Sequence, residues 1–316
     1  MKKWLVILLV FTLVGCGAQA EDPPIRVGLC VPTANASYAP ALQKELERNN
    51  CYVNILAGKN DQSLQNRQVT QLVHEGYDLL IIEPVIRLAA DALLAGLESA
   101  KIPAILLNTP QQATRTNRQV CQVAFSEQQA GALQGQCVLN TPDRGDLNGD
   151  GRVACAYLAG PEDLVNTSIH VNACLAALRD QEVSVELLAQ VYGDDSPARG
   201  QALTEGLLDR FGNAIEVLFC GNSQLALGAL DALRAAGQVV NEDIYVVCIG
   251  DDPEIVRCVE AGTITGAVVA DYATMAVRVT EAAEILLSGR SLPQITAPYT
   301  LKQAQNIRGK NSSSCG

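Results

Sequence analysis

The sequence predicts an α/β protein built from two doubly wound parallel-sheet lobes, and two observations lead to this prediction. Ten short β-rich segments alternate with segments of helical spacing. Such alternation is typical of parallel sheets that carry helices on both faces. The β-rich segments also form two runs of five, separated by a polar loop. Two runs favour two lobes over a single barrel.

The expected elements can be placed in order along the chain. The first run of strands is Arg26–Val31, Tyr52–Leu56, Leu79–Ile82, Ala104–Leu107 and Val120–Phe125. The second run is Val153–Leu158, Val185–Val191, Val217–Cys220, Tyr245–Ile249 and Gly266–Val269. Helices are expected between them, at Ala41–Asn49, Leu64–Glu75, Ala89–Ala100, Ile169–Leu178, Gln201–Phe211, Ala226–Ala236 and Ile255–Ala261. Ligands of such sheets bind beyond the carboxyl ends of the strands, so polar residues just after a strand are candidates for a site.

The N-terminus has the pattern of an export signal. A basic start, Met1-Lys2-Lys3, precedes about ten mostly apolar residues, which are too few to span a bilayer. The following Leu13-Val14-Gly15-Cys16 resembles the bacterial lipobox, whose cysteine is lipidated. The alternative is an ordinary signal peptide with a chance cysteine. We expect residues 1–24 to be signal and tether, and Cys16 to anchor the protein to the outer face of the bacterial cell membrane.

Composition and charge narrow the function classes. Hydrophobic residues make up 48% of the chain and charged residues 18%, which is typical of a globular protein. The chain has 23 basic and 34 acidic residues, and loss of Lys2 and Lys3 takes the net charge from −11 to −13. An acidic chain without a basic patch argues against a nucleic-acid partner. A monomer is expected.

The cysteines allow two interpretations. Eleven are present, so ten remain besides Cys16, and an even number in an exported protein is compatible with disulfides. However, Cys30, Cys155, Cys220 and Cys248 lie within expected core strands, where cysteine serves as a small apolar residue. No CxxC and no zinc-like spacing occurs. We expect mostly buried thiols, with the pairing of any disulfide left open.

Motifs of several enzyme classes are missing from the sequence. It contains no GxSxG, no P-loop, no HExxH, and no GxGxxG opening the first helix. Only two histidines, His74 and His170, could act as bases near neutral pH. These features favour a binding protein without catalytic residues over an enzyme.

One loop carries the pattern of a calcium site. In Asp146-Leu147-Asn148-Gly149-Asp150-Gly151-Arg152, oxygen donors occupy positions one, three and five, and glycine occupies position six. Arg152, at position seven, would bind through its backbone carbonyl. Position nine is Ala154 and position twelve is not glutamate, so another carboxylate must complete the site. The alternative is an Asx-rich turn without metal.

The calcium-like loop and the strand expected directly after it resemble those of the periplasmic galactose/glucose-binding proteins, and the resemblance covers nearly the whole mature chain. In that family a distant glutamate completes the calcium site, and Glu216 stands at the matching place. Phe219-Cys220-Gly221-Asn222 and Gly250-Asp251 resemble the family's strands that end in ligand residues. The resemblance implies a type I periplasmic binding protein fold, a structural Ca²⁺ held by Asp146, Asn148, Asp150, Arg152 and Glu216, and a hinge of three crossings. Its implied boundaries are 25–125 plus 271–302 for the N-terminal lobe and 126–270 plus 303–310 for the C-terminal lobe.

The sugar pocket departs from the family pattern. Tyr38 replaces a stacking phenylalanine, and Ala36 stands where an aspartate is expected. The family's His-x-Asp-x-x-x-Arg cluster aligns with Leu164, Asn166 and His170. The expected stacking tryptophan is missing, with Asp194 or Asp195 near its place, and Ala270 replaces a final asparagine. The candidate ligand-binding residues are Tyr38, Asn108, Asn166, His170, Asn222 and Asp251.

The resemblance implies a lipoprotein that captures a small molecule, expected to be a galactose- or glucose-like sugar or a sugar of altered specificity, by hinge closure for an ABC importer. Several alternatives stay open. They are a nucleoside- or other small-molecule-binding protein that feeds a sensory receptor, and an exported glycoside hydrolase, which would need an acidic pair at the appropriate separation.

Overall fold

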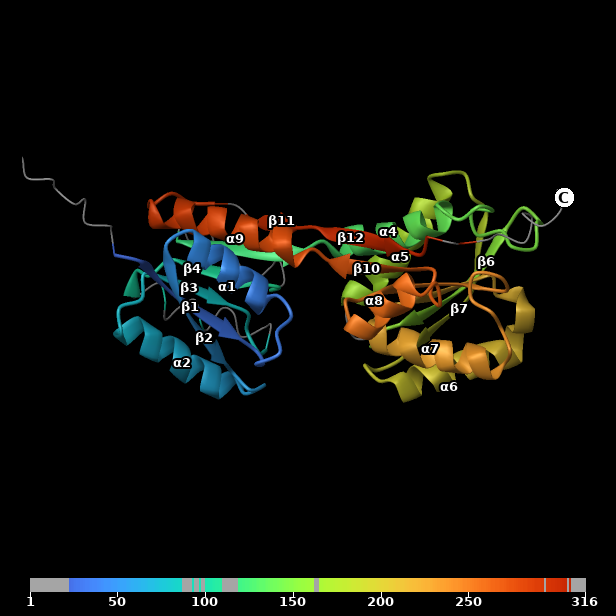
Figure 1. Ribbon diagram of the computed structural model, residues 1–316, viewed down its shortest axis with the longest axis horizontal. Coiled ribbons are helices and arrows are strands. Elements are labelled where there is room, and N and C mark those ends of the chain that lie inside the picture. The colour runs from blue at the N-terminus through green and yellow to red at the C-terminus, as the bar shows by residue number, and fades with distance from the viewer. Residues whose placement is uncertain are drawn as a thin grey trace, which may run out of the picture.

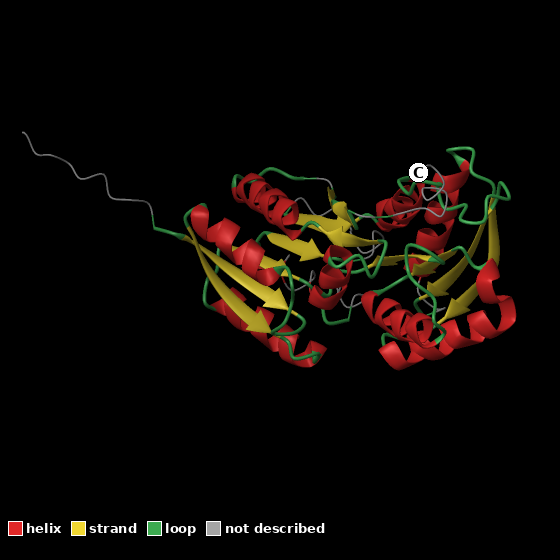
Figure 2. Ribbon diagram, turned by 45° about the vertical axis from the view of Figure 1, so that its right-hand side comes forward, coloured by secondary structure: helices red, strands yellow, loops and turns green. Residues whose placement is uncertain are grey.

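Two lobes, each built around a six-stranded sheet, make up the protein in a computed structural model (Figure 1). The structure describes residues 23–86, 93, 97, 100–109, 119–161, 165–292, 294–305 and 307. Helices cover both faces of the sheets, as Figure 2 shows. This confirms the predicted fold class.

The N-terminal sheet has the order β11-β5-β4-β3-β1-β2, and all its strand pairs are parallel. Its strands are β1 (Ile25–Val31), β2 (Cys51–Ala57), β3 (Leu79–Ile82), β4 (Ala104–Leu107), β5 (Val120–Phe125) and β11 (Ile295–Ala297). The described helices of this lobe are α1 (Ala39–Arg48), α2 (Gln62–His74) and α9 (Tyr272–Leu287). Asp61 caps α2 by accepting hydrogen bonds from the backbone N–H groups of Ser63 and Leu64.

The C-terminal sheet repeats this order as β12-β10-β9-β8-β6-β7, with β12 antiparallel to β10. Its strands are β6 (Val153–Ala159), β7 (Val185–Tyr192), β8 (Val217–Cys220), β9 (Tyr245–Ile249), β10 (Gly266–Ala270) and β12 (Tyr299–Gln303). Its helices are α4 (Glu127–Leu139), α5 (Val165–Arg179), α6 (Pro197–Phe211), α7 (Ser223–Ala235) and α8 (Pro253–Glu260), with a 3₁₀ turn at Gly212–Ala214. None of the helices in the described part of the chain is long and apolar enough to cross a membrane.

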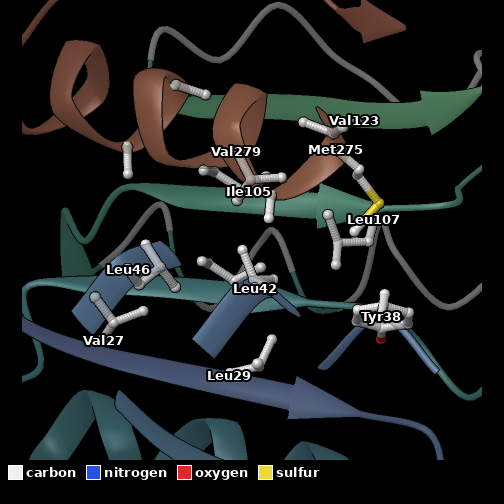
Figure 3. Close-up of a cluster of buried hydrophobic side chains, with 14 of the residues drawn as sticks. Val27, Leu29, Tyr38, Leu42, Leu46, Ile105, Leu107, Val123, Met275 and Val279 are labelled. Carbon is white, nitrogen blue, oxygen red and sulfur yellow. The ribbon is translucent and has the colours of Figure 1, made fainter. Parts of the chain in front are cut away.

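Each sheet separates two apolar cores. In the N-terminal lobe, α1 and α9 pack on one face, where Leu42 and Leu46 meet Met275 and Val279 over the strands (Figure 3). Figure 3 also places Tyr38 at the end of this core nearest the strand arrowheads. Tyr38, the residue that directly precedes α1, therefore extends the core to the carboxyl ends of the strands, where a site is expected.

All nine described cysteines are free thiols, and seven of them are buried. Burial raises the pKa of the Cys30 and Cys155 thiols to about 12, because the thiolate is poorly solvated there. The prediction that most cysteines serve as small apolar core residues is confirmed by the seven buried ones. Cys16 and Cys315 lie outside the described residues.

Three chain crossings join the lobes: β5 to α4, β10 to α9, and β11 to β12. The crossings are tied to one another, since the Asp271 N–H donates to the Pro298 carbonyl (3.0 Å) and the Tyr299 N–H to Gln129 Oε1 (3.0 Å). The boundary expected at residue 302 is wrong by one strand. The last crossing falls between β11 and β12, so residues 299–302 pair with β10 in the C-terminal sheet.

Candidate ligand-binding site

Three polar residues follow neighbouring strands of the N-terminal sheet and lie against one another. Tyr38 follows β1, Glu83 follows β3 and Asn108 follows β4. The Asn108 amide donates to Glu83 Oε1 at 2.9 Å. Asn108 adopts a left-handed backbone (φ 53°), a conformation that asparagine tolerates better than most residues, and its N–H donates to the Val123 carbonyl. The carboxyl edge of this sheet therefore presents an amide and a carboxylate together.

Tyr38 brings a buried hydroxyl to the same place. The side chain is 4% exposed, and its oxygen has no partner that meets the geometry of a hydrogen bond. Burial, followed by the nearby Glu83 carboxylate, raises the pKa of Tyr38 far above its ordinary range. A buried hydroxyl beside a carboxylate, with hydrogen-bonding capacity left over, is typical of a site that a ligand completes.

Tyr272, the first residue of α9, extends this group toward the other lobe. Its ring centroid lies 6.2 Å from that of Tyr38 and 5.9 Å from that of Phe125, and Phe125 in turn lies 5.0 Å from Tyr299. These separations are those of interacting aromatic pairs. The four rings form a continuous row across the hinge.

The C-terminal lobe adds Asp251, which follows β9, to this group of residues. The Tyr272 hydroxyl lies close to the Asp251 carboxylate. Burial, then Asp251, and more weakly Glu83, raise the pKa of Tyr272. Tyr272 therefore stands between two carboxylates that come from different lobes. We call Tyr38, Glu83, Asn108, Asp251 and Tyr272 the cleft cluster.

Gly250 allows Asp251 to reach this position. Its φ of 149° is one that residues with a side chain rarely adopt, and a Cβ there would lie 2.0 Å from the Ser223 hydroxyl. The loops after β8 and β9 can approach this closely only because residue 250 is glycine.

Asn222 performs a structural task at the end of β8. Its Oδ1 caps α7 by accepting from the Leu225 N–H at 2.8 Å. That contact occupies the amide oxygen and leaves the NH₂ group to act as a donor. Asp194, near the place of the missing aromatic residue, accepts a hydrogen bond from the Ser196 hydroxyl at 2.6 Å.

His170 pairs with a residue that sequence reasoning did not single out. Its Nε2 lies 2.5 Å from Glu127 Oε2, at the start of α4 beside the hinge. Gly131 lets α4 and α5 approach closely here, because a Cβ at that position would lie 2.3 Å from the His170 carbonyl. The side chain of Asn166 lies outside the described residues.

Sequence reasoning also missed Glu83 and Tyr272. Glu83 directly follows a predicted strand, so the strand-end rule alone could have found it. Tyr272 opens a helix that the sequence reading did not place, and its nearness to Asp251 depends on the hinge crossing at residues 270–272.

The predicted calcium loop is held together by hydrogen bonds from its own backbone N–H groups. Asp146 Oδ1 accepts from the N–H groups of Gly149 (2.8 Å) and Asp150 (3.1 Å), and Oδ2 accepts from that of Gly151 (2.9 Å). Asn148 Oδ1 accepts from the Asp150 N–H (2.7 Å). Gly151, at position six, has φ 84°, as the sharp turn requires.

The side chain of Glu216, which lies 62 residues after Ala154 in the sequence, contacts the backbone of the loop. It is 2% exposed, and its two oxygens accept from the N–H groups of Asn148 (2.9 Å) and Ala154 (2.8 Å). Burial raises the pKa of Glu216, these two N–H groups lower it, and Asp146 and Asp150 raise it again. The acidic side chains repel one another there, and an oxygen-seeking cation would relieve that repulsion.

The fit to a cation has two further features. The Arg152 side chain reaches Glu186 (2.6 Å) and Asp150 (3.6 Å), so it neutralises part of the charge at the loop's edge. Within the described ranges, no three His, Cys, Asp or Glu side chains converge closely enough to hold a metal by themselves. A Ca²⁺ bound here would therefore need neutral donors, the Asn148 amide oxygen and the Arg152 carbonyl, beside the carboxylates.

The profile of the periplasmic binding protein domain matches residues 27–291, and the chain belongs to this family. The family is one of binding proteins, in agreement with the lack of catalytic motifs. The chain is 23% identical over 309 residues to the D-galactose/methyl-galactoside binding periplasmic protein MglB of Haemophilus influenzae, covering 94% of this chain and 92% of that protein. It is 22% identical over 320 residues to the ribose import binding protein RbsB of Bacillus subtilis, covering 96% and 99%.

Solved structures show the same fold. A periplasmic ribose ABC transporter protein from Conexibacter woesei superposes with a TM-score of 0.76 at 17% identity, covering 92% of this chain and 95% of that one. An ABC transporter solute binding protein from Bacillus halodurans with bound myo-inositol superposes with a TM-score of 0.70 at 20% identity, covering 91% and 98%.

Proposed function

We propose that this protein captures a sugar or a related polyol between its two lobes and delivers it to an ABC importer in the membrane. The observation that carries the proposal is the cleft cluster, in which residues at the strand ends of both lobes meet beside the hinge. Relatives and structural neighbours whose names state sugar or polyol ligands support it.

The chemistry of the cluster suits a polyol. Carboxylate and amide groups of Glu83, Asn108 and Asp251 can accept from and donate to hydroxyl groups. The rings of Tyr38 and Tyr272 can cover the apolar C–H face of a sugar. The exact sugar is open, because half of the polar groups expected from the galactose/glucose-binding pattern are replaced, and buried polar groups without partners reject the wrong ligand.

Capture would proceed by closure of the hinge. Ligand that contacts both Glu83 and Asp251 binds better when the lobes are close, so it shifts the equilibrium toward a closed form. The closed form would then be the one that docks on the permease.

A structural Ca²⁺ belongs to the proposal. Asp146, Asn148, Asp150 and Glu216 would hold it through side-chain oxygens, and Arg152 through its backbone carbonyl. The loop lies at the amino end of β6, away from the strand ends that form the cleft. Bound Ca²⁺ would therefore stabilise the C-terminal lobe without contacting the ligand.

A lipid on Cys16 would hold the protein at the membrane. The proposal rests on the signal-like segment and on Leu13-Val14-Gly15-Cys16. Cys16→Ala should release the protein from the membrane fraction, and continued membrane retention of this variant would contradict the anchor.

Thermal melting against neutral sugars tests the binding function. Protein from residue 17 onward is melted with Ca²⁺ and with galactose, glucose, ribose, arabinose, myo-inositol or adenosine. A ligand of the folded state at a hundredfold excess over its Kd adds about 2.7 kcal/mol to stability. A rise with a sugar or polyol supports the proposal, and a rise with adenosine alone would replace it by nucleoside binding.

A further inference from the structure

We propose that the preferred ligand carries a protonated amino group, as an amino sugar or amino polyol does. This inference deepens the proposed function and rests on it. It concerns the charge of the ligand, which neither the fold nor the family membership determines.

The first argument is the charge of the cleft cluster. Glu83 and Asp251 are its two ionisable carboxyl groups, one from each lobe, and both are partly buried. None of the ion pairs in the described part of the chain includes either of them. The groups around them are neutral: the Asn108 amide donates to Glu83, the Tyr38 hydroxyl lies beside Glu83, and the Tyr272 hydroxyl lies beside Asp251.

The second argument is the buried Tyr38 hydroxyl. It is enclosed, lies beside Glu83, and lacks a partner with hydrogen-bond geometry. An incoming ammonium at Glu83 would let this hydroxyl turn its oxygen toward the cation, and so satisfy both groups. A neutral hydroxyl could do the same, but it would leave the two carboxylates without a compensating charge.

The third argument is the aromatic surroundings. Tyr38 and Tyr272 lie 6.2 Å apart between the two carboxylates. Aromatic faces attract cations, and a carboxylate next to such faces is the usual arrangement for recognising organic ammonium groups. The histidine of this region does not supply a free positive charge, because His170 is engaged by Glu127 at 2.5 Å.

Charge-assisted hydrogen bonds are about twice as strong as neutral ones, so closure around an ammonium would gain more than closure around a hydroxyl. Bringing Glu83 and Asp251 together on closure also costs repulsion, which a cation between them removes. The same closure therefore favours an amine-bearing ligand over its neutral counterpart.

Matched ligands test this directly. Isothermal titration of the soluble, calcium-loaded protein compares galactosamine and glucosamine with galactose and glucose, and with the N-acetyl derivatives, which keep the ring and lose the charge. We expect an amino sugar to bind at least about tenfold more tightly than both of its neutral counterparts. The preference should fall as salt rises from 0.05 to 0.5 M, because dissolved ions screen the attraction between the ammonium group and the partly exposed carboxylates.

Two variants locate the effect. Glu83→Gln keeps the hydrogen bond from Asn108 and removes the charge, and should abolish most of the preference for the amine. Glu47→Gln makes the same change at an exposed position of α1 and should leave the preference intact. Melting curves of both variants verify that they fold.

The outcomes separate the two proposals. Neutral sugars that bind as tightly as their amino counterparts would overturn the inference and leave sugar capture standing. An amine preference that survives Glu83→Gln and also Asp251→Asn would overturn the assignment to this cluster. Failure of every sugar, charged and neutral, to bind would contradict the proposed function, and this inference with it.

Discussion

The two lobes share one topology but use their strand ends differently. In the N-terminal lobe, Glu83 and Tyr38 keep hydrogen-bonding capacity toward the cleft. In the C-terminal lobe, Asn222 caps a helix and His170 pairs with Glu127, whereas the Asp251 carboxylate lies beside the hinge residue Tyr272.

The difference extends to what stabilises each lobe. The N-terminal lobe relies on aliphatic packing of α1 and α9 over its sheet. The C-terminal lobe buries a carboxylate, Glu216, beneath an acidic loop. We propose that the same fold places recognition of the ligand mainly in the N-terminal lobe and a stabilising Ca²⁺ in the C-terminal lobe.

Calcium removal has the largest expected effect. Saturating Ca²⁺, at a hundredfold excess over its Kd, should add about 2.7 kcal/mol, which corresponds to a rise in Tm of about 5–10 °C for a lobe of this size. Differential scanning calorimetry with and without a chelator measures it. Unchanged melting after chelation would contradict the calcium site.

Glu216→Gln should abolish this calcium response, whereas Glu186→Gln, which alters only the ion pair with Arg152, should retain it.

The calcium-free wild-type protein should also lose stability as pH rises. Because the pKa of Glu216 is raised in the folded state, the folded protein binds the proton more tightly than the unfolded one, and that advantage disappears at higher pH. Glu216→Gln removes this slope.

Replacement of Asn222 distinguishes its role as a helix cap from a role in contacting the ligand. Asn222→Ala should lower the free energy of unfolding by about 1 kcal/mol, since the Leu225 N–H loses its acceptor. Asn222→Asp keeps an acceptor oxygen and should retain that stability. If Asn222→Asp still weakens sugar binding in calorimetric titration, the NH₂ group contacts ligand, and equal binding would confine Asn222 to its structural task.

Replacement of Asn108 tests the backbone of the N-terminal site. Asn108→Gly and Asn108→Ala both remove the hydrogen bond to Glu83. Alanine must also hold a left-handed conformation, so the alanine variant should be about 1 kcal/mol less stable than the glycine variant in urea unfolding. Equal stabilities would mean that the loop after β4 relaxes freely.

Tyr38→Phe has the smallest expected effect on stability. Because its hydroxyl has no hydrogen-bond partner with good geometry, its removal should change the free energy of unfolding by less than about 0.5 kcal/mol. A loss above about 1 kcal/mol in chemical denaturation would show that the hydroxyl is bonded in the free protein.

Much of the fold follows from local pattern. The ten predicted strands agree with β1 to β10 within one residue at each end, because buried parallel strands such as Leu79–Ile82 are continuous apolar runs. β11 and β12 were missed, since Ile295–Ala297 is three residues long and Tyr299–Gln303 alternates exposed and half-buried positions at a sheet edge.

The site was less predictable for a different reason. Asp251 and Asn108 follow strands, and that position alone singles them out. Tyr272 and Asp251 become neighbours only after both lobes and the hinge have formed. His170 and Glu127 become neighbours only after α4 and α5 have packed together within the C-terminal lobe. No local spacing in the chain encodes such contacts.

Small-angle X-ray scattering of the soluble protein tests the central claim most directly. The radius of gyration is compared with and without a saturating concentration of whichever sugar or amino sugar of the two panels binds most tightly, with calcium present throughout. Capture between the lobes predicts a smaller radius in the bound protein, and no such change in a Tyr272→Ala, Asp251→Ala double variant. A ligand that binds in calorimetry yet leaves the radius unchanged in the wild-type protein would contradict closure of the two lobes around it.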